Sequence, residues 1–131
     1  MPYNTYMTET KLNALVVDDE LDIIANFRKV APYTGIQVVE SASTLEEANI
    51  IIADARRMAK VQLAIFDRSL IRSDGLQGET LAQAIIATYP HIFVFGHSTT
   101  KFTTPVNHMF IKPYQLGEMA TQIRLTMAQG K

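Results

Sequence analysis

The chain has 131 residues and a formal net charge of −1, with 47% hydrophobic and 19% charged residues, so it is predicted to be one globular domain and not a disordered chain. The near-neutral charge argues against a nucleic-acid surface that depends on bulk electrostatics, and no apolar run approaches the ~18 residues of a membrane span. The absence of cysteine excludes disulfides and thiolate metal sites, and residues 1–10 contain no signal-peptide core. We therefore expect a soluble, cytoplasmic domain with no membrane insertion.

Short apolar runs alternate along the chain with stretches of helical periodicity. The predicted strands cover residues 12–17, 36–39, 61–66, 92–97 and 107–111. The predicted helices cover residues 21–32, 43–59 and 76–88, and a last one starts near residue 116. The first of these helices is expected to stop at Pro32, and the second opens with capping-box spacing at Ser43. Strands separated by helices predict a parallel sheet with helices on both faces.

Charged residues follow three of the predicted strands. Asp18 and Asp19 follow the first strand, Asp67 the third and Lys112 the fifth. Since ligands of parallel α/β sheets bind at the carboxyl ends of the strands, these groups are expected to converge at one edge. Carboxylates brought together in this way repel one another, and Mg²⁺ bound by one or two of them would supply the missing positive charge.

The chemistry open to this group is phosphoryl transfer. Asp67 could attack phosphorus, because carboxylates serve as phosphoryl acceptors. Lys112 would place a point charge on the phosphoryl oxygens. An anion held near Lys112 would also offset the unfavourable position of a cation just before a helix N-terminus.

These residues form a set that resembles a known family. The segments Val16–Glu20 (VVDDE), Ile65–Asp67 (IFD), Asp74-Gly75 and Ile111–Tyr114 (IKPY) are similar, in order and spacing, to the receiver domain of bacterial two-component response regulators. The resemblance covers residues 11–129 and leaves residues 1–10 as an N-terminal tail. It implies an α/β flavodoxin-like (CheY-like) three-layer sandwich with a five-stranded parallel sheet in the order 2-1-3-4-5.

The resemblance also implies a role for each site residue. Asp18 and Asp19 would hold Mg²⁺ together with Asp67, and the backbone carbonyl of Ser69 would complete the metal site. Asp67 would be the phosphoacceptor, and Lys112, followed by a cis bond to proline in typical members, would contact the phosphoryl group.

A hydroxyl at the end of the fourth strand is the remaining feature of the family's site. Alignment of the Tyr89-Pro90 segment with the usual lead-in to this strand places Ser98 there, and a register one residue shorter would place His97 there instead. We expect Ser98, because a hydroxyl can donate to a phosphoryl oxygen after a small movement.

Three departures from the family lie outside the metal and acceptor positions. Residues 99–106 contain four threonines and Pro105, so the fourth helix is expected to be short or absent. Met109 stands where many receivers carry Tyr or Phe, and Ile71 where a proline is common. These differences concern the output surface more than the phosphorylation chemistry.

The leading interpretation is a stand-alone receiver that takes a phosphoryl group from a sensor histidine kinase or a histidine phosphotransfer protein. The length leaves no room for an output domain, so output is expected through a protein target in trans, unless the chain is a fragment. Direct nucleic-acid binding is not expected. A homodimer is compatible with this interpretation. The alternative is a binding module on the same fold that works without phosphorylation.

Two enzyme-like interpretations fit less well, so the chain is not expected to be an enzyme beyond weak self-phosphorylation and self-dephosphorylation. A phosphatase of the haloacid dehalogenase type needs a second acid two residues after the nucleophile, where this chain has Ser69. A flavodoxin needs N–H donors for a phosphate after the first strand, where this chain is acidic. Three basic residues, Arg56, Arg57 and Lys60, are interpreted as a solvated helix face.

Overall fold

The computed structural model describes residues 11–67, 77–98, 108–111 and 116–130. The strands are β1 (Leu12–Val17), β2 (Ile36–Ala42), β3 (Leu63–Asp67), β4 (Phe93–Ser98) and β5 (His108–Ile111). The helices are α2 (Leu21–Thr34), α3 (Leu45–Ala53), α4 (Ala55–Met58), α5 (Gln77–Thr88) and α6 (Leu116–Gln129). None of the helices in these segments has the length and apolar character needed to cross a membrane.

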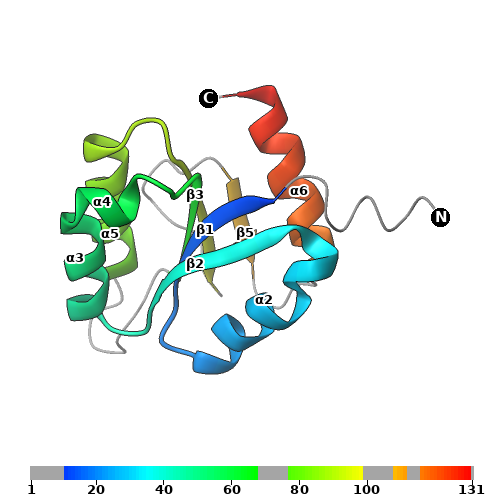
Figure 1. The fold of residues 1–131 in the computed structure, drawn as a ribbon, viewed down its shortest axis with the longest axis horizontal. Coiled ribbons are helices and arrows are strands. Elements are labelled where there is room, and N and C mark those ends of the chain that lie inside the picture. Colours follow the sequence, from blue (N-terminus) through cyan, green and yellow to red (C-terminus); the bar gives the residue numbers. More distant parts are fainter. Residues whose placement is uncertain (1–10, 68–76, 99–107, 112–115, 131) are drawn as a thin grey trace.

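The strands form one parallel sheet in the order β2-β1-β3-β4-β5. This order confirms the predicted topology, in which β2 is added on one side of β1 and the later strands are added on the other. Figure 1 shows α2 and α6 on one side of the sheet and α3, α4 and α5 on the other. The result is the three-layer α/β sandwich expected from the alternation of strands and helices. The segment expected to lack a regular fourth helix, residues 99–107, lies outside the described residues.

Side-chain alternation along the central strands builds two cores. On β1, Ala14 and Val16 pack in the core beneath α2 and α6, whereas Leu15 and Val17 pack in the core beneath α3 and α5. β3 repeats the pattern, with Ile65 in the first core and Phe66 in the second. Because successive side chains of a strand point to opposite faces, a continuous apolar run fills both layers.

Helix α2 is longer than predicted. It passes through Pro32 and ends at Thr34 instead of stopping at the proline. Pro32 lies in the last turn and is exposed. It removes one backbone N–H donor from α2, and the helix ends two residues later at Thr34. The stop comes from Gly35, whose φ of 76° is left-handed and whose N–H donates to the carbonyl of Ala31 over 2.8 Å.

The predicted helix at residues 43–59 is wrong as a single element, because it is divided at Asp54. The cap of α3 lies one residue later than the predicted box at Ser43, because Thr44 is the N-cap and accepts from the N–H of Glu47. Asp54 then adopts an extended conformation, and its carboxylate accepts from the N–H groups of Arg56 and Arg57 to begin α4. A side chain that offers the backbone such acceptors competes with helix continuation.

Candidate functional site

Three carboxylates meet at the carboxyl edge of the sheet. Asp18 follows β1 directly, and Asp67 is the last residue of β3, the neighbour of β1. One carboxylate oxygen from each of Asp18, Asp19 and Asp67 lies within 4.8 Å of the others. The convergence predicted from strand order is therefore present for all three acids.

Local hydrogen bonds hold Asp18 in place. Its Oδ1 accepts from the N–H of Glu20 over 2.8 Å, and its own N–H donates to the carbonyl of Ala42, at the end of β2, over 3.0 Å. The first bond forms the turn that leads into α2, whose first residue is Leu21. The acids therefore lie beside the N-terminus of α2, where the helix dipole favours negative charge.

Burial makes the charge on this cluster costly. Asp18 is fully buried and Asp67 is 7% exposed, while Asp19 is exposed. Two unit charges about 5 Å apart repel by roughly 3 kcal/mol at an effective dielectric constant of about 20. A cation among the three oxygens would offset that repulsion.

The donor set fits Mg²⁺. This ion prefers oxygen ligands at about 2.0–2.1 Å, so two oxygens on one ion lie at most about 4.2 Å apart. The oxygens of Asp18, Asp19 and Asp67, all within 4.8 Å of one another, need only a small adjustment to reach that geometry. The exposed side chain of Asp19 leaves the cluster open to solvent, which fits an ion that keeps several waters.

The remaining predicted site residues are only partly described. Ser98 is the last residue of β4, and the strand register places His97, not Ser98, opposite Asp67. Ser69 and Lys112 lie outside the described residues, although Lys112 directly follows the end of β5 at Ile111. The roles assigned to Ser69, Ser98 and Lys112 remain predictions.

A hollow of about 350 Å³ lies between α2 and the junction of β2 with α3, and its lining includes Ala42, whose carbonyl accepts from the N–H of Asp18. Leu21 and Ile24 contribute apolar surface, and Arg28, Ser41 and Glu47 contribute polar groups. Leu21 is 66% exposed and comes two residues after Asp19. A molecule that approached the acids from this side would therefore meet a mixed apolar and polar surface.

An ion cluster around the buried carboxylate of Glu40 was missed by the sequence reasoning, which placed its basic residues on a solvated face. Glu40, 8% exposed on β2, accepts from Arg57 Nη2 over 2.6 Å and lies 3.2 Å from Lys60 Nζ. These hydrogen bonds and charges, Arg57 first, hold the pKa of Glu40 below its ordinary value, and the same pair raises the pKa of Arg57. Arg56 and Lys60 are exposed as predicted, although Lys60 pairs with Glu40, and Arg57 is half-buried.

Comparisons with known proteins connect this geometry to a fold of known type. No family model matches the chain, and no curated protein matches it. Solved structures do. The chain superposes on a CheY-like response regulator receiver domain protein from Methanospirillum hungatei with a TM-score of 0.68 and 18% identity, covering 92% of this chain and 100% of that one.

Two further solved structures agree with the first. The non-phosphorylated receiver domain of HemR from Leptospira biflexa gives a TM-score of 0.73 at 19% identity, covering 92% of this chain and 98% of that one. The receiver domain of the PhyR response regulator from Erythrobacter litoralis gives 0.69 at 20% identity, covering 91% of this chain and 92% of that one. The chain therefore has the CheY-like receiver fold, which confirms the predicted resemblance at the level of fold.

Proposed function

We propose that this chain is a response-regulator receiver domain that accepts a phosphoryl group on Asp67. The observation that carries the proposal is the group of Asp18, Asp19 and Asp67 at the carboxyl edge of a receiver fold. Asp67 ends a buried strand, so its position is set by the sheet rather than by a loop. A carboxylate held in this way is a suitable nucleophile, because little entropy is lost in orienting it.

The transfer forms one bond and breaks another. A carboxylate oxygen of Asp67 forms a bond to phosphorus while the phosphorus–nitrogen bond of a phosphohistidine breaks, and the histidine nitrogen keeps the electron pair. The other ring nitrogen of the phosphohistidine carries a proton as the bond breaks, so the products are an aspartyl phosphate and a neutral imidazole. Mg²⁺, when bound, would neutralise the charge that develops on the phosphoryl oxygens. Asp18 and Asp19 would hold it, with Asp18 already oriented by its bond to the N–H of Glu20.

The residues beyond the acid cluster complete the proposed site. The backbone carbonyl of Ser69 would add a metal ligand, Lys112 would contact the phosphoryl oxygens, and Ser98 would donate a hydrogen bond to them. The support is their place in the sequence at or just beyond strands that reach the same edge of the sheet. Phosphorylation would then change the charge at the ends of β4 and β5 and bias a neighbouring surface.

The proposal extends to the protein's setting. The receiver would comprise residues 11–129 and work in the cytoplasm as a stand-alone domain in a phosphorelay. Its donor would be a sensor histidine kinase or a histidine phosphotransfer protein, and its output a protein target in trans. The hollow beside Leu21 offers such a donor a surface next to the acids.

The test is to incubate the protein with a small acyl phosphate and Mg²⁺ and to measure its intact mass. A gain of one phosphoryl group is expected, sensitive to hydroxylamine as an acyl phosphate is, and lost when Mg²⁺ is chelated. Asp67→Asn should abolish the gain. Asp22→Asn is the control for the same chemical change, because Asp22 is an exposed acid near the start of α2 and lies outside the cluster.

Two outcomes would contradict this function. One is the absence of any phosphoryl gain with small donors and with a phosphohistidine protein. The other is a gain that survives Asp67→Asn unchanged. If partner binding were then indifferent to Asp67 and to Mg²⁺, the binding module without phosphorylation would be the better description.

A further inference from the structure

Strand β2 is an edge strand of the sheet, and its outer edge is the one that faces away from β1. Its one partner among the described strands is β1, so no described strand pairs with its outer edge. The strand has seven residues, Ile36–Ala42, with one charged side chain and three β-branched apolar ones. Segments of this length and composition pair readily with a second copy of themselves when their edge is open.

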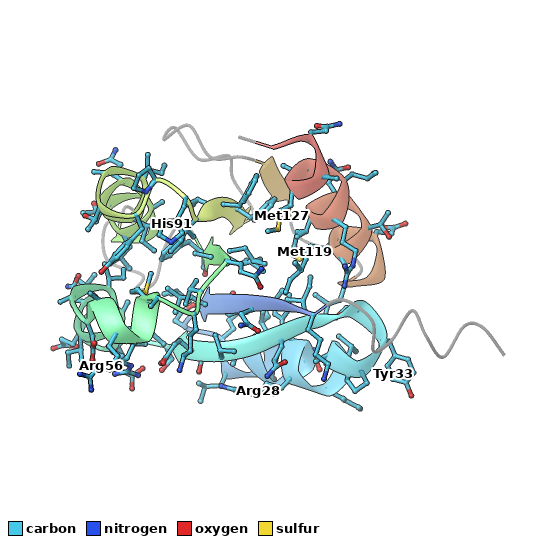
Figure 2. The ribbon with its side chains drawn as sticks, turned by 45° about the horizontal axis from the view of Figure 1, so that its top comes forward. Arg28, Tyr33, Arg56, His91, Met119 and Met127 are labelled. Atoms are coloured by element: carbon cyan, nitrogen blue, oxygen red, sulfur yellow. The ribbon has the colours of Figure 1, made fainter. Side chains whose placement is uncertain are left out.

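Side chains of α2 occupy that edge. Thr34 Oγ1 accepts from the N–H of Ile36 over 3.1 Å. The guanidinium of Arg28 donates to the carbonyl of Val38 through Nη1 over 3.2 Å and to Ser41 Oγ through Nη2 over 2.9 Å. Backbone groups that bond to side chains of α2 are not used in the ladder with β1. Figure 2 shows Arg28 on the outer side of β2.

The two contacts of Arg28 straddle an irregularity in the strand. Ala14 of β1 pairs with Val38, but the next residue, Leu15, pairs with Glu40, so Val39 is an extra residue in β2. This bulge reverses the alternation of side chains. Val38 faces the core beneath α2, whereas Glu40, two positions later, meets Arg57 from α4 on the opposite face of the sheet.

We propose that Arg28 covers the outer edge of β2 and keeps it from pairing with β2 of a second copy of this chain. The guanidinium bridges the bulge from Val38 to Ser41, so an incoming strand finds the carbonyl of Val38 already bonded and a charged side chain across its path. Bulges and charged side chains on edge strands oppose pairing. A two-fold related copy is the occupant that an open β2 fits, because an antiparallel pair of identical strands satisfies both edges at once.

The experiment compares Arg28→Ala with Lys29→Ala by sedimentation velocity from low to high micromolar concentration. Lys29 is exposed and adjacent to Arg28, so its replacement controls for loss of a positive charge on α2. The wild type and Lys29→Ala should show no association through β2. Arg28→Ala should shift to a dimer as concentration rises, with a far-UV circular dichroism spectrum that shows it is folded.

A cysteine probe locates the contact, since the chain has no cysteine of its own. Gln37→Cys, at an exposed position of β2, should cross-link two chains in the Arg28→Ala background and not in the wild-type background. Arg56→Cys, at an exposed position on α4, is the control site and should not cross-link in either.

If Arg28→Ala does not fold, Arg28→Met serves in its place, because it retains an aliphatic stem but has neither the charge nor the donors that bridge Val38 and Ser41. A folded Arg28 variant that sediments as the wild type does would overturn the proposal. So would cross-linking that is as strong at position 56 as at position 37, because it would mean association that does not use the edge. None of these readouts depends on the metal or on Asp67, so they are independent of the proposed function.

Discussion

Replacing Asp67 with asparagine should stabilise the metal-free protein. The substitution keeps the size of the side chain and removes one of three charges whose oxygens lie within 4.8 Å of one another. At an effective dielectric constant of about 20, each pair at this distance repels by roughly 3.5 kcal/mol. Asp19 is exposed, so solvent screens its share, and the substitution also weakens other interactions of the Asp67 carboxylate. We expect a net gain of about 1–2 kcal/mol in the free energy of unfolding.

Mg²⁺ should stabilise the two proteins to different extents. A ligand that binds only the folded state stabilises it by about 1.4 kcal/mol when its concentration is ten times the dissociation constant. The wild type should gain about this much, whereas the asparagine variant, which offers one carboxylate fewer, should gain less. The stability difference between the two should therefore shrink or reverse as Mg²⁺ is added.

The assay is urea unfolding followed by far-UV circular dichroism, in buffer with a chelator and again with Mg²⁺. The chain has five tyrosines and no tryptophan, so circular dichroism is a better probe than intrinsic fluorescence. Glu46→Gln is the control, because Glu46 is an exposed acid in the first turn of α3, outside the cluster. The reasoning is refuted if Asp67→Asn is less stable than the wild type in chelator, or if Mg²⁺ stabilises both proteins equally.

Three further predictions concern the scaffold. Arg57→Ala should lower the free energy of unfolding by about 1–2 kcal/mol, because it removes two hydrogen bonds from the buried carboxylate of Glu40. The control is Arg56→Ala, at an exposed neighbour, which should change it by less than about 0.5 kcal/mol in the same urea assay. The folded pKa of Glu40 lies below its ordinary 4.5, so the contribution of Glu40 to stability is complete above that pH and is lost as pH falls through the lower folded value. Glu40→Gln should therefore flatten this part of the curve of stability against pH. An unchanged slope would contradict the assignment. Gly117→Ala should raise the free energy of unfolding by about 0.5 kcal/mol, because an added Cβ meets nothing within 4 Å and alanine favours a helix. Pro32→Ala should raise it by about 1 kcal/mol, because it restores a backbone donor. A fall in the melting temperature of either variant would mean that the local conformation is not as described.

The acid cluster could be predicted because its position depends only on which residues follow each strand and on the parallel arrangement of the strands. Asp18 and Asp67 each follow an apolar run, and parallel strands deliver their carboxyl ends to one edge. Strand identity and strand order were enough, and no side-chain packing had to be known. The length of α2 was a different matter, because Pro32 is tolerated in a last turn and Gly35 sets the end.

The sequence by itself determined the layers, the order of the elements and the meeting of three acids, because these follow from the periodicity of apolar residues and from where charges come after strands. Only the tertiary structure decided that Glu40 is buried against Arg57 and that Arg28 lies across the edge of β2. Both contacts join residues 10 to 17 positions apart and depend on one extra residue in β2. A bulge reverses which face a side chain takes without leaving a mark in composition or periodicity, so the partners of these side chains are known only once the strands are paired.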